Sequence, residues 1–169
     1  MVRNKIPEAT LSLVGSGARS IGNRNTYTPE GLLLLEEISD AEKIKLLYKS
    51  RVFVLPSSIE AFGFSFIEAL AAGVPVIGLR STAIPELVKH GENGILLEPK
   101  ITKRQVFNTE VSHWEPDISE LASAIICTLT DDCIYKKMQK NCFSSIVALN
   151  WYNVANKYLG LYRFCPRKV

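Results

Sequence analysis

Short apolar runs alternate with helical patterns along the first hundred residues of the chain. The apolar runs cover residues 10–14, 32–35, 52–55, 75–79 and 94–97, and each has the length of a β-strand. Apolar residues at helical spacing predict helices that begin at Asp40, a fitting N-cap, and that cover residues 65–72 and 84–89. Strands and helices joined by short links indicate an α/β fold: a Rossmann-like parallel sheet with helices on both faces.

The pattern changes after residue 97. Residues 98–116 show no convincing periodicity, so we expect a long loop there, either functional or mobile. Three helices are predicted over about residues 117–130, 133–148 and 151–163, and Asp117 with Glu120 resembles a capping box at the start of the first. We therefore expect a Rossmann-like domain over residues 1–150, followed by a C-terminal helix and tail over residues 151–169.

Composition narrows the class of protein only a little. The chain has 169 residues, of which 47% are apolar and 22% charged, as in soluble globular domains. A net charge of +3 does not predict nucleic-acid binding, and no apolar run has the length of a membrane span or a signal peptide. None of the four cysteines forms a CxxC pair, and both histidines lie far from them, so we expect no metal site.

The segment after residues 52–55 carries the candidate chemistry, because ligands of parallel sheets bind at the carboxyl ends of the strands. Gly63, Phe64 and Ser65 would present free backbone amides at a helix N-terminus, where a phosphate is favoured. Glu60 and Glu68 flank the same turn. Carboxylates repel phosphate and accept hydrogen bonds from hydroxyl groups. A ligand with both phosphates and hydroxyls is a nucleotide or a nucleotide sugar.

A purely structural interpretation fits the same residues equally well. Ser65 and Glu68 have the spacing of a capping box, which alone would explain Glu68. Glu60 would then be a solvated loop residue. The residues by themselves leave both interpretations open.

Residues 53–75 resemble the signature of family 4 glycosyltransferases, in which seven residues separate two glutamates, as they separate Glu60 and Glu68. The runs Ile84-Pro-Glu-Leu-Val and His90-Gly-Glu-Asn-Gly are similar to the family as well. The resemblance covers about residues 7–99, with a weaker similarity from Glu115 onward. It implies the C-terminal, nucleotide-sugar-binding domain of a retaining, two-domain GT-B enzyme.

The resemblance also implies residue roles. Glu68 would hold the ribose hydroxyls, Glu60 would act at the donor sugar near the reacting carbon, and the amides of residues 63–65 would meet the sugar or the diphosphate. Ser16, at the end of another strand, would line the nucleotide site or simply form a tight turn. The implied donor is a UDP- or GDP-hexose, with no metal or other cofactor and no nucleic-acid partner. The cysteines, which form no predicted disulfide or metal site, favour a reducing cytoplasmic location, with peripheral attachment to a membrane as an option.

Two departures from the family pattern raise a second hypothesis. The basic pair that grips the donor diphosphate in the family would precede the first strand of this chain. The first strand of the domain, that pair and the N-terminal acceptor domain are therefore predicted to lie outside the chain. Thr82 and Ala83 also replace two glycines. The alternative is a non-catalytic nucleotide-binding or interaction module from a truncated glycosyltransferase; in either case we expect the chain alone to be inactive.

Overall fold

The computed structural model of the chain describes residues 1–18, 30–106 and 109–164. The strands are β1 (Leu11–Val14), β2 (Leu32–Leu35), β3 (Phe53–Leu55), β4 (Val76–Leu79), β5 (Gly94–Leu97), β6 (Lys100–Val106) and β7 (Thr109–Glu115). The helices are α1 (Val2–Lys5), α3 (Asp40–Lys49), α4 (Phe64–Ala71), α5 (Ile84–Leu87), α6 (Ile118–Thr130), α7 (Asp132–Ile146), the short η1 (Val147–Leu149) and α8 (Trp151–Phe164).

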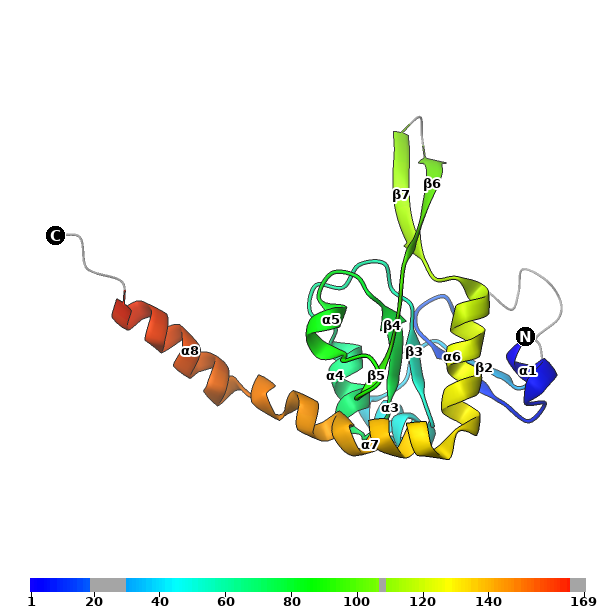
Figure 1. Cartoon of the computed structure of the whole chain (residues 1–169), viewed down its shortest axis with the longest axis horizontal. Coiled ribbons are helices and arrows are strands. Elements are labelled where there is room, and N and C mark those ends of the chain that lie inside the picture. The colour runs from blue at the N-terminus through cyan, green and yellow to red at the C-terminus, as the bar shows by residue number, and fades with distance from the viewer. Residues whose placement is uncertain (19–29, 107–108, 165–169) are drawn as a thin grey trace.

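A parallel sheet of β3, β4 and β5, in that order, forms the centre of the domain. Every residue of β4 is buried, as its unbroken apolar run predicts. Phe66 of α4 and Val76 of β4 belong to one core cluster, whereas Ile77 and Leu79 pack with Ala124 of α6 in another. Figure 1 shows α4 and α5 on one side of this sheet and α6 on the other. The predicted α/β fold with helices on both faces is confirmed.

A second parallel pair, β1 with β2, stands beside the central sheet. Within the described residues no ladder of hydrogen bonds joins β1 to β3. In a doubly wound sheet the strand order is 3-2-1-4-5-6. If β2 and β1 take the places of strands 3 and 2, and β3, β4 and β5 those of strands 4, 5 and 6, the break between β1 and β3 is the place of strand 1. Leu11 and Leu33 are about half exposed, at 55% and 50%.

The prediction of a loop over residues 98–116 was wrong. β6 and β7 pair in antiparallel register from Lys100 with Glu115 to Val106 with Thr109, and the hairpin projects from the domain in Figure 1. Apolar and polar residues do not alternate regularly along the two strands, and Ile101 is 66% exposed. Period-two alternation is the sequence signal of a half-buried strand, and the sequence of this hairpin lacks it.

Side-chain capping marks the starts of α3 and α6. Asp40 is the first residue of α3, and Ser39 is its N-cap, so the predicted N-cap was one residue too late. Ser39 Oγ accepts from the Glu42 amide at 3.3 Å, while Glu42 Oε2 accepts from the Ser39 amide at 2.8 Å. This reciprocal capping box selects serine over the neighbouring aspartate. Asp117 is the N-cap of α6, as expected.

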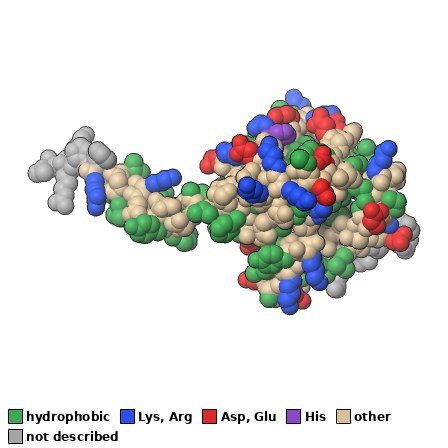
Figure 2. Space-filling view, turned by 60° about the horizontal axis from the view of Figure 1, so that its bottom comes forward, with side chains coloured by type: hydrophobic (Ala, Val, Ile, Leu, Met, Phe, Trp, Pro, Cys, Tyr) green, Lys and Arg blue, Asp and Glu red, His purple; other side chains and the backbone are tan. Residues whose placement is uncertain are grey.

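The last helix, α8, extends away from the domain as an arm (Figure 1). Trp151, Tyr152 and Tyr162 are 85%, 76% and 76% exposed, and Figure 2 shows hydrophobic and basic side chains along this arm. None of the helices in residues 1–18, 30–106 and 109–164 is long and apolar enough to cross a membrane.

Candidate functional site

The N-terminus of α4 is built around Gly63. Gly63 caps the helix in the left-handed conformation, with φ 82° and ψ 46°, which glycine adopts without steric cost. A Cβ atom there would lie 2.9 Å from Leu87 Cδ1. The carbonyl of Gly63 accepts the first helical bonds, from the amides of Phe66 at 3.0 Å and Ile67 at 3.2 Å. The turn after β3 therefore leads directly into a helix whose dipole points at the loop.

Three successive amides at this helix start have no hydrogen-bond partner among the described residues, and Gly63, which carries the first of them, is buried. In the described part of the chain, the backbone N–H groups of Gly63, Phe64 and Ser65 donate to no acceptor. The side chains of Phe64 and Ser65 are exposed, so solvent and ligands reach this end of the helix. Unpaired amides at the positive end of a helix dipole suit an anion such as a phosphate.

Glu68 lies one turn further along α4 and does not cap the helix. Since Gly63 is the N-cap, a capping box would need its acidic residue at position 66, which is Phe66. The capping-box interpretation of Ser65 and Glu68 is therefore wrong. Glu68 Oε1 instead accepts a hydrogen bond of 2.7 Å from Lys43 Nζ of α3. The Glu68 side chain is 40% exposed.

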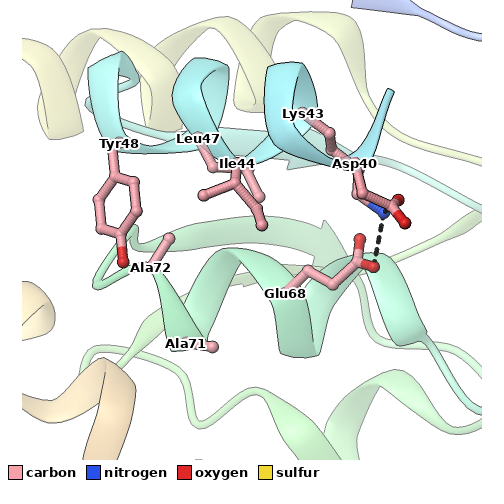
Figure 3. A pocket seen from close by; sticks show the side chains of 8 residues that line it. All are labelled: Asp40, Lys43, Ile44, Leu47, Tyr48, Glu68, Ala71 and Ala72. Atoms are coloured by element: carbon pink, nitrogen blue, oxygen red, sulfur yellow. Dashed lines mark hydrogen bonds and ion pairs between the residues drawn. The ribbon is translucent and has the colours of Figure 1, made fainter. Parts of the chain in front are cut away.

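A groove of about 380 Å³ runs between α3 and α4 (Figure 3). Asp40, Lys43 and Glu68 form its polar end, and the rest of its lining is Ile44, Leu47, Tyr48, Ala71 and Ala72. Lys43 Nζ also lies 3.1 Å from Asp40 Oδ1. These two carboxylates, Glu68 first, raise the pKa of Lys43 above its usual 10.5, so the ammonium is charged at neutral pH.

Glu60 lies in the loop between β3 and α4, half-buried, and does not line this groove. Its amide donates a hydrogen bond of 3.0 Å to Thr82 Oγ1 in the loop after β4. Ser58 Oγ in the same loop donates to the carbonyl of Trp114 in β7 at 2.7 Å. The loop that carries Glu60 is thus tied both to the β4–α5 loop and to the base of the hairpin.

The structure brings five of the six predicted site residues to one corner. Glu60, Gly63, Phe64, Ser65 and Glu68 all lie on the β3–α4 loop and the first turns of α4. Ser16 follows β1 in the other parallel pair, exposed. The Ala18 amide donates to the Gly15 carbonyl at 3.0 Å, which confirms a tight turn around Ser16. A role for Ser16 toward a ligand stays a prediction.

Sequence reasoning missed Lys43 as a site residue. Lys43 lies four residues before the buried Leu47 of α3, so the two residues share a helical face, and this spacing was an available signal. A basic residue on the packed face of a helix needs an acidic or polar partner. No group of three His, Cys, Asp or Glu side chains within the described ranges is placed to hold a metal ion.

Comparison with known proteins assigns the family. Residues 1–131 match the family described as "Glycosyl transferases group 1". N-acetyl-alpha-D-glucosaminyl L-malate synthase of Bacillus anthracis is 36% identical over 95 residues, which cover 54% of this chain and 24% of that protein. The chain therefore spans only part of the length of its curated relatives.

Solved structures agree on the fold. Anabaena Alr3699/HepE, crystallised with UDP-glucose, has a TM-score of 0.68 at 18% identity, over 94% of this chain and 42% of that chain. The C-terminal domain of the group 1 glycosyl transferase LpcC from Francisella tularensis has a TM-score of 0.64 at 20% identity, over 90% of this chain and 74% of that chain. The chain belongs to the group 1 glycosyltransferases and corresponds to the C-terminal domain of their two-domain GT-B fold.

Proposed function

We propose that this chain is the donor-binding part of a retaining glycosyltransferase that transfers a hexose from a nucleotide sugar to an acceptor hydroxyl. One observation carries the proposal: three unpaired amides at the start of α4 lie between two partly accessible carboxylates. The amides suit a diphosphate and the carboxylates suit hydroxyl groups, and a nucleotide sugar has both. The UDP-glucose bound by a protein of the same fold supports this ligand class.

Each residue has a proposed role. Glu68 accepts hydrogen bonds from the ribose hydroxyls, and the amides of Gly63, Phe64 and Ser65 hold the diphosphate or the sugar. Glu60 lies near the anomeric carbon, where a fixed negative charge stabilises the positive charge of the transition state. The acceptor hydroxyl attacks on the face from which the diphosphate leaves, so configuration is retained without a protein nucleophile. We propose that no metal is needed.

Titration calorimetry tests donor binding. UDP-glucose, UDP, GDP and ADP are titrated into the wild type and into Glu68→Gln, with Glu86→Gln as matched control, because Glu86 is exposed on α5. Hydrogen bonds to a charged group contribute about 1.5–3 kcal/mol, so we expect Glu68→Gln to weaken the preferred nucleotide at least about tenfold. Absence of binding at millimolar concentration, or equal binding by Glu68→Gln, refutes the proposal.

A transfer assay tests whether this chain alone can transfer the sugar to an acceptor. We expect no sugar transfer by this chain alone, because the acceptor would be bound by the part of the GT-B fold that the chain does not contain. Transfer of glucose from UDP-glucose to added acceptors would contradict that expectation.

A second candidate is a non-catalytic nucleotide-binding or interaction module. The Lys43–Glu68 ion pair favours it, since the pair accounts for Glu68 without a ligand. On this hypothesis Glu68→Gln leaves nucleotide affinity unchanged, so the same titration separates the two candidates.

A further inference from the structure

The ion pair between Lys43 and Glu68 joins α3 to α4 through two residues that are 25 positions apart in the sequence. Lys43 Nζ lies 2.7 Å from Glu68 Oε1, and Figure 3 shows both side chains meeting at the polar end of the groove between α3 and α4. The side chains are 35% and 40% exposed, so the pair borders solvent and remains open to a small polar ligand.

Lys43 engages only one of the two oxygens of Glu68. Among residues 1–18, 30–106 and 109–164, Oε2 accepts no hydrogen bond, and Oε1 accepts only the one from Lys43. A second contact of Lys43 Nζ, with Asp40 Oδ1 at 3.1 Å, fixes the ammonium from its own helix. The carboxylate of Glu68 is thus held at one oxygen while the other keeps its lone pairs for a donor.

The fold gains little from this pair. Ion pairs as exposed as this one contribute little to stability, because water screens the charges and two long side chains are immobilised. The arrangement matters more for recognition, since a carboxylate held in one orientation loses less conformational freedom when it accepts hydrogen bonds from a ligand.

We propose that Lys43 is a positioning residue for ribose recognition: it holds Glu68 Oε1 so that the carboxylate is oriented to accept hydrogen bonds from the 2′- and 3′-hydroxyls of the nucleotide. The inference rests on the proposed function, because it needs a ribonucleotide at Glu68. Lys43 touches no reacting atom and acts through Glu68. It therefore sets the discrimination between ribose and deoxyribose, and leaves recognition of the phosphates to the amides of α4.

The test is a comparison of UDP with 2′-deoxy-UDP by calorimetry, with the ADP and GDP pairs in parallel because the base is unspecified. The variants are Lys43→Met, which removes the donor, Lys43→Arg, which keeps one, and Lys45→Met, a control at an exposed lysine on the same helix. We expect the wild type to prefer the ribonucleotide about tenfold. Lys43→Met reduces this ratio to about twofold or less, with little change for the deoxynucleotide, and Lys43→Arg restores most of it.

The possible failures are distinguishable. If Lys43→Met weakens the ribo- and deoxynucleotide equally and keeps the ratio, Lys43 has only a structural role and the inference is wrong. If the ratio disappears in Glu68→Gln but persists in Lys43→Met, the inference alone falls and the proposed function stands. If no nucleotide binds the wild type, both fall. Urea unfolding of each variant identifies loss of fold. Asp40→Asn weakens the contact that fixes Lys43 and is expected to lower the ratio partly, so it tests the positioning of Glu68 without changing Lys43 or Glu68.

Discussion

The backbone amide of Glu60 donates a hydrogen bond to the side chain of Thr82, with 3.0 Å between the nitrogen and Oγ1. Thr82 has φ 44° and is the one non-glycine residue with positive φ in the described part of the chain. Glycine adopts this conformation without cost, which would explain the glycine that the family resemblance implies at this position. Threonine is strained there, but its hydroxyl fixes the loop of the proposed catalytic glutamate.

Thr82→Val removes the hydroxyl that accepts the hydrogen bond from the Glu60 amide and keeps the shape of the side chain. The backbone strain at positive φ is therefore the same in the variant and in the wild type. Losing one hydrogen bond at an exposed site is expected to lower the free energy of unfolding by about 0.5–1.5 kcal/mol. Thr82→Ser keeps the hydroxyl and is the matched control, with a smaller change. Urea unfolding measures both. Equal stability of wild type and Thr82→Val would show that the hydroxyl does not secure the Glu60 loop.

A structural element can be predicted from the sequence when its surroundings require a recognisable pattern of apolar and polar residues within the element itself. Val76–Leu79 is an unbroken apolar run because both faces of β4 are covered, and its position was predicted almost to the residue. The hairpin of β6 and β7 was missed because its sequence lacks the regular alternation that signals a half-buried strand. Ser39 and Asp40 are both good N-caps, and only the reciprocal bond with Glu42 decides between them.

The candidate site divides in the same way. Glu60, Gly63 and Glu68 lie on one continuous segment, so their spacing carries the information. Lys43 reaches Glu68 from another helix, and only tertiary packing of α3 against α4 determines that contact. No fixed spacing in the sequence identifies a contact between two residues that lie on different helices.

Gly63→Ala and Gly73→Ala form a matched pair. Both glycines have positive φ, 82° and 74°, but a Cβ atom at Gly73 meets nothing within 4 Å, whereas one at Gly63 meets Leu87 and Phe66. Left-handed backbone costs a non-glycine residue about 1–2 kcal/mol, which both variants share. Overpacking adds about 1–3 kcal/mol in Gly63→Ala alone. Urea unfolding should therefore rank Gly63→Ala below Gly73→Ala, and equal destabilisation would contradict close packing at the start of α4.

Asn93 joins α5, α7 and the loop between α5 and β5 from a fully buried position. Its Nδ2 donates to the Leu87 carbonyl at 3.0 Å and to Ser145 Oγ at 2.8 Å, and its Oδ1 accepts from the Lys89 amide at 2.8 Å. Asn93→Ala leaves the Leu87 carbonyl and the Lys89 amide without a partner, while Ser145 Oγ keeps its bond to the Cys142 carbonyl, and we expect a loss of about 2–4 kcal/mol in the free energy of unfolding.

The control for that loss is Asn141→Ala, which removes one exposed hydrogen bond, to the Glu92 carbonyl, and should cost about 1 kcal/mol or less. Thermal and urea unfolding of both variants give the comparison. If Asn93→Ala is no less stable than Asn141→Ala, the network does not stabilise the packing of α7 on the domain.

Asp117 predicts how stability depends on pH. Its hydrogen bond from Lys100, followed by the amide hydrogen bonds that cap α6, holds the pKa of its carboxyl well below the usual 3.8. A carboxyl whose pKa is lower in the folded state stabilises the fold fully above the unfolded pKa, and this contribution disappears as pH falls toward the folded pKa.

Asp117→Asn is the right comparison, because asparagine caps helices about as well and removes only the charge. The wild type should be more stable than Asp117→Asn by a constant margin at neutral pH, and the margin should shrink once the pH falls below about 4. Urea unfolding at a series of pH values measures this margin; a margin that stays constant into the acid range would show that the charge of Asp117 does not stabilise the junction of the hairpin and α6.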